Sequence, residues 1–93
     1  MKNLTITGDV ENGTLCATLY STKIVEVSGG TIILRTGGFL TPLTKWAMNK
    51  VSEDYKLDFK VFQKNKNFHV TTKSGTYKFY CHVTFSLSSG QPL

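Results

Sequence analysis

The chain has 93 residues, 11 Lys or Arg against 6 Asp or Glu, and a net charge of +5. This length predicts one domain with a thin core. No run approaches the roughly 18 to 20 apolar residues that span a bilayer, which excludes a transmembrane helix. Residues 1–5 lack the apolar segment of a signal peptide, so we expect a cytosolic protein with reduced Cys16 and Cys81.

The charge is unevenly distributed along the chain. Residues 1–44 carry three basic and three acidic side chains, whereas residues 45–93 carry eight lysines and three acidic side chains. The whole excess therefore lies in the second half, which favours an acidic partner such as nucleic acid or an acidic protein surface. The same net charge is also ordinary for a small soluble domain.

The N-terminal part reads as strands. Residues 4–7 form a possible first strand, residues 14–20 alternate apolar and polar, and residues 22–27 and 31–34 are rich in β-branched side chains. Gly29-Gly30 lies between the last two runs and predicts a tight hairpin, because glycine accepts the positive φ of that turn.

A helix is predicted next. Thr41 is a suitable N-cap and Pro42 suits the first helical position, and the pattern ends near Asp54 or Tyr55. We expect the side chains that repeat with helical spacing to face the core, and the opposite side chains to face solvent. The core set is Leu43, Trp46, Ala47 and Val51, with Tyr55 as a further candidate, and the exposed set is Thr41, Lys45, Met48, Asn49 and Ser52.

The C-terminal part returns to β-structure. Residues 57–61 and 68–71 alternate, with a polar turn at 63–67 between them. Apolar side chains then occupy every second position from Tyr77 to Leu87, which predicts one long half-buried strand with Cys81 inside. Residues 88–93 read as a flexible tail.

These elements predict an α+β domain over residues 1–87. One helix packs on a mostly antiparallel, curved sheet of five to six strands in the order β-β-β-α-β-β-β. Open edge strands on so thin a sheet make a homodimer possible.

No metal, cofactor or catalytic group is expected. Cys16, His69, Cys81 and His82 have the right side chains for zinc, but none of the paired spacings of zinc sites is present. Cys81 and His82 are neighbours in a predicted strand and would point to opposite faces. The acidic residues are scattered, so the sequence indicates a protein that is not an enzyme.

The two glycines before the helix leave two interpretations open. Gly37-Gly38 could present backbone N–H groups to an anion at the helix start, with Arg35 and Lys45 adding positive charge. The same residues could simply turn the chain into a capped helix.

Lysines and aromatic side chains interleave in the second half, as in proteins that bind single-stranded nucleic acid. Alternation places Phe62 with Lys60, and Tyr80 with Lys78, on the outer face of the predicted sheet. The full candidate set is Lys56, Lys60, Phe62, Lys64, Lys66, Lys78 and Tyr80.

Three segments form a distinctive pattern. They are Thr22-Lys23-Ile24-Val25, then Thr36-Gly37-Gly38-Phe39-x-Thr41-x-x-Thr44-Lys45-x-x-Met48-Asn49, and then Val61-Phe62-Gln63-Lys64. This pattern resembles that of a group of small proteins encoded by bacteriophages and prophages. The resemblance covers roughly residues 20–70. Those proteins are largely uncharacterised, so the resemblance implies a phage origin and a place in the host cytoplasm but no mechanism.

The leading hypothesis is a non-enzymatic phage protein that binds a host protein or nucleoprotein complex and inhibits a defence system of the CRISPR or restriction type. Its contact surface would be Arg35, Gly37, Gly38, Phe39, Lys45, Met48 and Asn49. The alternative is a basic module that binds nucleic acid through the lysine and aromatic face.

Overall fold

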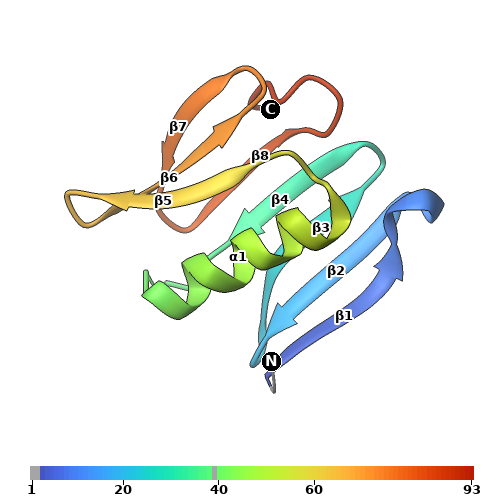
Figure 1. Cartoon of the computed structure of the whole chain (residues 1–93), viewed down its shortest axis with the longest axis horizontal. Helices are drawn as coiled ribbons and strands as arrows, with labels where there is room; N and C mark the ends of the chain where they lie inside the picture. Colours follow the sequence, from blue (N-terminus) through green and yellow to red (C-terminus); the bar gives the residue numbers. More distant parts are fainter. Residues whose placement is uncertain (1–2, 39) are drawn as a thin grey trace.

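The computed structural model describes residues 3–38 and 40–93, so Phe39 lies outside the described residues. They form an α+β fold with one α-helix and eight antiparallel strands in two sheets (Figure 1). The element order is β-β-β-β-α-β-β-β-β. The expected fold class is confirmed, but the single sheet of five to six strands is wrong.

The larger sheet is built mainly from the N-terminal half. Its strands are β1 (Leu4–Asp9), β2 (Thr14–Leu19), β3 (Thr22–Ser28), β4 (Thr31–Arg35) and β8 (His82–Ser86), with a short 3-10 helix, η1 (Val10–Asn12), after β1. They lie in the order β1-β2-β3-β4-β8, with every pair antiparallel. The predicted hairpin at Gly29-Gly30 is confirmed, with φ of 56° and 79° at the two glycines.

The helix α1 (Pro42–Tyr55) begins and ends where the sequence predicts. The Thr41 Oγ1 accepts a hydrogen bond from the Thr44 N–H at 3.3 Å, which caps the first turn. Lys56 follows the last turn in the left-handed conformation, with φ of 53°.

The smaller sheet contains β5 (Lys60–Lys64), β6 (Asn67–Thr72) and β7 (Gly75–Phe79) in that order. The predicted long strand over 77–87 is therefore wrong, because it divides into β7 in the smaller sheet and β8 in the larger one. Thr36 lies at the break: its hydroxyl donates to the Tyr80 carbonyl at 2.9 Å and its N–H to the Cys81 carbonyl at 2.9 Å. Cys81 is exposed at this crossover, not buried as expected.

The core is one cluster to which both sheets and the helix contribute. Phe59, just before β5, meets Phe85 of β8 edge to face, with ring centroids 5.9 Å apart. Phe68 and Phe79 make a similar contact within the smaller sheet. The fully buried side chains include Leu15, Ile24, Val25, Val27, Ile32, Leu34, Met48, Val51, Val61, Phe68, Val70 and Phe85.

The helix is rotated relative to the expectation. Met48 has an exposed fraction of 0% and Ser52 of 4%, whereas Trp46 is 47% exposed. The expected exposure of Met48 and burial of Trp46 are both wrong. The cause is β5, which runs beside α1 (Figure 1), so that the helix buries a stripe against two sheets instead of one.

Two polar side chains join α1 to the edge of β5. The Asn49 Oδ1 accepts from the Val61 N–H at 2.7 Å, and the Asn49 Nδ2 donates to the Val61 carbonyl at 2.8 Å. The Ser52 hydroxyl accepts from the Phe59 N–H at 3.1 Å and donates to the Phe59 carbonyl at 2.6 Å. These side chains take the place of a neighbouring strand, so Asn49 is a structural residue.

Replacing Asn49 with Ala should destabilise the protein strongly. The change leaves the Val61 N–H and carbonyl without partners, at a cost of about 1–3 kcal/mol for each buried group. We expect the free energy of unfolding in urea to fall by roughly 2–4 kcal/mol. Lys50→Ala in the same helix removes only an exposed pair with Asp54 and should cost less than about 0.5 kcal/mol. Equal losses in the two variants would contradict the role of Asn49.

The C-terminal residues, expected to be flexible, are hydrogen-bonded in the structure. The Ser86 N–H donates to the Gln91 carbonyl and the Leu93 N–H to the Thr84 carbonyl, each at 2.9 Å. The buried Thr72 hydroxyl donates to the Gly90 carbonyl at 2.7 Å. The segment therefore covers the outer edge of β8.

Deleting residues 91–93 should expose this edge and weaken the fold. Two backbone hydrogen bonds are lost, each with a net value of about 0.5–1.5 kcal/mol. We expect a fall of roughly 1–3 kcal/mol in the free energy of unfolding, and faster exchange of the Ser86 amide hydrogen measured by NMR. An unchanged exchange rate at Ser86 would show that the segment does not protect β8 in solution.

Candidate nucleic-acid interface

The outer face of the smaller sheet brings together most of the predicted basic and aromatic residues. Strand register places Phe62 of β5 opposite His69 of β6, and His69 opposite Lys78 of β7. Lys60 and Lys64 lie two positions to either side of Phe62, at a spacing of about 7 Å along the strand. The predicted shared face of Lys60, Phe62 and Lys78 is confirmed.

An aromatic pair lies at the centre of this face. The rings of Phe62 and His69 stack with centroids 5.2 Å apart and an interplanar angle of 12°. The His69 Nδ1 lies 3.2 Å from the Asn67 carbonyl oxygen. A carbonyl only accepts, so Nδ1 is the donor and holds the ring orientation. The result is a half-exposed aromatic platform of two parallel rings, with a lysine on each side.

The smaller sheet carries only positive ionic side chains. From Phe59 to Leu93 the sequence has five lysines and no Asp or Glu. Lys73 lies 3.7 Å from Asp58, at the end of the sheet away from the β5–β6 turn. In residues 3–38 and 40–93, no carboxylate pairs with Lys60, Lys64, Lys66 or Lys78. Their charge is available to an anionic partner.

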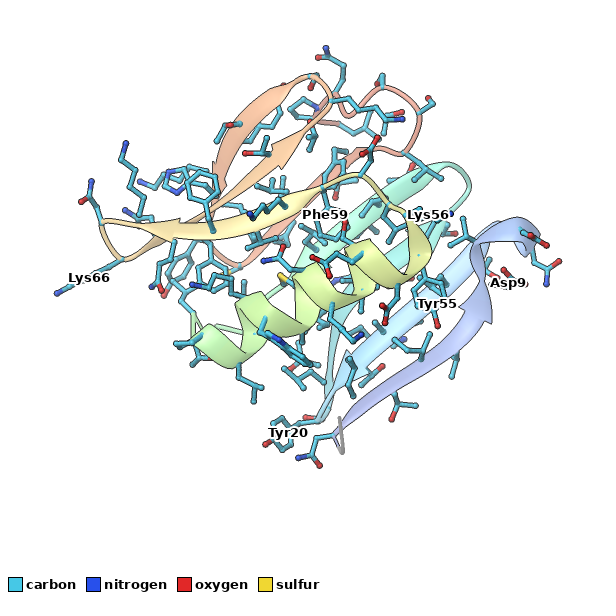
Figure 2. The ribbon with its side chains drawn as sticks, in the orientation of Figure 1. Asp9, Tyr20, Tyr55, Lys56, Phe59 and Lys66 are labelled. Atoms are coloured by element: carbon cyan, nitrogen blue, oxygen red, sulfur yellow. The ribbon has the colours of Figure 1, made fainter. Side chains whose placement is uncertain are left out.

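Two of the predicted lysines lie beyond opposite ends of β5. Lys66 is at the tip of the β5–β6 hairpin, where Asn65 and Lys66 both have positive φ (Figure 2). Lys56 follows the last turn of α1 at the far end of β5 and lines a shallow hollow with Glu53 and Asp58. Lys56 is therefore next to acidic residues and is not part of the sheet face.

Two further residues, Tyr80 and His69, are compared with the prediction for this face. Tyr80 follows β7 and is 62% exposed, and its predicted place on this face stays a prediction. His69 was not among the predicted binding residues. Its outward position could have been found by pairing β5 with β6 across the Asn65-Lys66 turn, which sets Phe62 against His69.

The described residues of the other predicted surface, for a host complex, do not share one exposed face. Arg35 lies on the face of the larger sheet that turns away from α1 and pairs with Glu26 at 2.6 Å. Lys45 is half-buried on the helix, Met48 is in the core, and Asn49 holds β5. Arg35 and Lys45 therefore lie on opposite sides of the sheet.

The two glycines fit the turn interpretation. Gly37 and Gly38 have φ of 62° and 83°, and the Gly38 N–H donates to the Thr36 hydroxyl at 3.1 Å. A Cβ at Gly37 would stand 2.8 Å from the Thr22 Oγ1, so the backbone passes too close for any side chain there. The anion-binding interpretation stays a prediction.

No cluster of metal ligands was found in the part of the chain that the structure describes, where no three His, Cys, Asp or Glu side chains gather. Cys16 lies on β2 opposite Glu26 of β3, and Cys81 lies at the crossover between the sheets. His69 and His82 belong to different sheets.

Comparison with known proteins found no matching family model, no matching curated protein and no matching solved structure. Among the described residues, no helix is both long and apolar enough to cross a membrane.

Proposed function

We propose that this protein binds single-stranded nucleic acid through the outer face of β5, β6 and β7. The observation that supports this most is the stacked Phe62–His69 pair, flanked by Lys60, Lys64 and Lys78 with no acidic residue on the sheet. An exposed ring can stack on any base, and the lysines can follow the phosphate backbone.

A single strand fits this face better than a duplex. The platform is a sheet surface with a ring at its centre, and a base must be unstacked from its neighbours to lie on that ring. Lys60 and Lys64 each lie about 7 Å from Phe62 along β5, and Lys66 extends the row to the hairpin tip. A strand laid along β5 would meet Lys60, Phe62, Lys64 and Lys66 in turn.

The hypothesis of a host complex now has less support from the residues. It depended on polar side chains of α1 that no structural role explained, and Asn49 and Met48 both have such roles. A phage origin is compatible with either function, so the resemblance does not decide between them. We therefore place nucleic-acid binding first.

The affinity for a single-stranded oligonucleotide should fall steeply with salt. Neutralising four phosphates with Lys60, Lys64, Lys66 and Lys78 predicts a log–log slope of about −3, which is roughly a 50-fold loss between 50 and 200 mM salt. Fluorescence anisotropy with a labelled 20-mer measures the slope. The double variant Lys60→Gln, Lys78→Gln should halve it approximately.

The matched control is Lys23→Gln, Lys50→Gln, which removes the same charge from exposed sites on β3 and α1. This control should leave the slope nearly unchanged. An equal reduction in the two double variants would assign the effect to net charge and not to the sheet face. No binding at low salt would reject the proposed function.

The aromatic platform has its own test. Phe62→Leu keeps an apolar side chain but removes the ring, and loss of one base stack is worth about 1–3 kcal/mol. We expect at least a fivefold loss of affinity at constant salt slope. Phe62→Tyr retains the ring and should bind like the natural protein. If Phe62→Leu also bound normally, Phe62 would not be part of the interface.

A further inference from the structure

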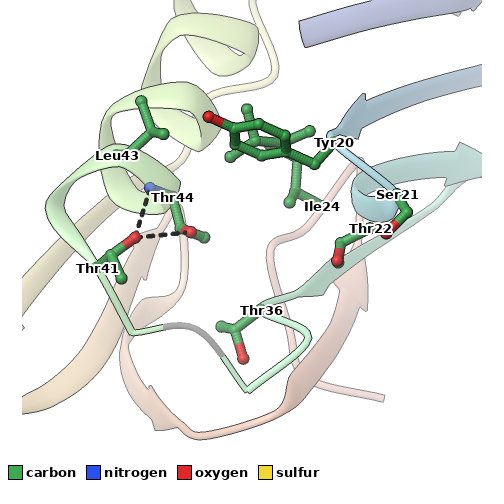
Figure 3. A pocket seen from close by; sticks show the side chains of 9 residues that line it. Tyr20, Ser21, Thr22, Ile24, Thr36, Thr41, Leu43 and Thr44 are labelled. Carbon is green, nitrogen blue, oxygen red and sulfur yellow. Dashed lines mark hydrogen bonds between the residues drawn. The ribbon is translucent and has the colours of Figure 1, made fainter. Parts of the chain in front are cut away.

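A second hollow lies where the β2–β3 turn meets the start of α1, and the proposed sheet face does not use it. Its volume is about 340 Å³. It is formed by the β2–β3 turn, the end of β4 and the first turn of the helix (Figure 3). The lining residues are Leu19, Tyr20, Ser21, Thr22, Ile24, Thr36, Thr41, Leu43 and Thr44.

The lining combines an apolar floor with hydroxyl groups, and none of the described residues that form it is charged. Three hydroxyls are already engaged in the fold. Thr36 donates to the Tyr80 carbonyl, and the Thr41 and Thr44 hydroxyls are 3.1 Å apart. The hydroxyls of Tyr20, Ser21 and Thr22 take part in no hydrogen bond between described residues, so they can meet a ligand.

Tyr20 lies at this hollow with a backbone conformation that is unfavourable for tyrosine. It has a φ of 55°, a left-handed conformation that favours glycine and asparagine, and its N–H donates to the Asn3 carbonyl at 2.9 Å. Its ring extends over Ile24 toward Leu43 (Figure 3) but is 66% exposed. Neither the turn nor the core requires a large aromatic side chain here.

Thr22 lies close to the backbone of Gly37. A Cβ at Gly37 would lie 2.8 Å from its Oγ1 and 3.0 Å from its Cγ2. The backbone at Gly37, with φ of 62°, therefore passes close to the Thr22 side chain, which lines the hollow. Gly37 thus shapes the site without offering a side chain to it.

We propose that this hollow binds an uncharged nucleobase. The tyrosine ring and the aliphatic side chains of Leu19 and Ile24 suit the flat faces of a heterocycle. Hydroxyls both donate and accept, so they suit the mixed donors and acceptors of a base edge. The absence of charge on the lining disfavours a phosphate, a carboxylate or an amine. The volume lies within the range of small-molecule sites.

The base can come from a free nucleoside or from an unpaired position in a strand. The first probes are adenosine, guanosine, cytidine and uridine, with ribose and inorganic phosphate as controls. In ¹⁵N-¹H NMR titrations, at least one nucleoside should shift amides of residues 19–24, 36 and 41–44, and the controls should not. Absence of these shifts with all four nucleosides would overturn the proposal.

Tyr20→Asn separates a binding role from a structural one. Asn fits the left-handed backbone, so the melting temperature should stay equal or rise, while nucleoside affinity should fall about tenfold with the loss of stacking. Thr22→Val keeps the shape, loses the hydroxyl and should weaken binding severalfold. Retained affinity in both variants, or loss of affinity together with loss of the fold, would contradict the proposal.

The source of the base is decided with an oligonucleotide. If a nucleic-acid strand supplies the base, Tyr20→Asn also lowers the affinity for a 20-mer. An abasic 20-mer then binds the variant and the natural protein equally well. If free nucleosides are the ligands, only nucleoside binding changes. Phe62→Leu should leave nucleoside shifts at the hollow intact, so failure of the sheet-face proposal does not affect this one.

Discussion

The arrangement of the whole molecule depends on the hydrogen bonds that Asn49 and Ser52 make to the edge of β5. Phe59, just before β5, and Val61, within it, direct both backbone groups toward the helix, and two side chains one turn apart satisfy all four groups. The backbone of a helix cannot pair with the edge of a sheet, so side chains of α1 make the hydrogen bonds that a neighbouring strand would make. This contact fixes the rotation of α1 and directs the opposite face of the smaller sheet, with Phe62 and His69, to solvent.

Local signals in the sequence predicted local structure well, and long-range contacts account for the errors. Gly29-Gly30, Thr41-Pro42 and the strand alternations depend on neighbours in the chain, and the structure confirms them. The division of residues 77–87 into two strands does not depend on neighbours in the chain. Apolar side chains keep their period of two through Cys81, and the break depends on Thr36, which is more than 40 residues away in the sequence. The orientation of α1 was mispredicted because Asn49 and Ser52 are polar yet inward.

The same distinction explains which site residues could be predicted. Lys60, Phe62 and Lys78 were found by alternation alone, because each strand of the smaller sheet has one buried face. Placing His69 next to Phe62 also required the pairing register of β5 and β6. The host-complex surface assumed that Met48 and Asn49 face solvent, whereas Met48 is buried and Asn49 bonds to β5. The hollow at Tyr20 could not be predicted, since it requires the β2–β3 turn, the end of β4 and the start of α1 to meet.

The two proposed sites use different physical forces, and the charge distribution explains why they can coexist. All the net charge lies in the second half of the sequence, so the proposed contact of the smaller sheet with a polyanion would act over a distance set by ionic strength. The hollow lies beside the neutral N-terminal strands, and its apolar floor and hydroxyls act only at contact. A long-range, salt-sensitive attraction to phosphates and a short-range, salt-insensitive fit to a base are the two terms that nucleic-acid recognition combines. Here they are carried by separate parts of one small fold.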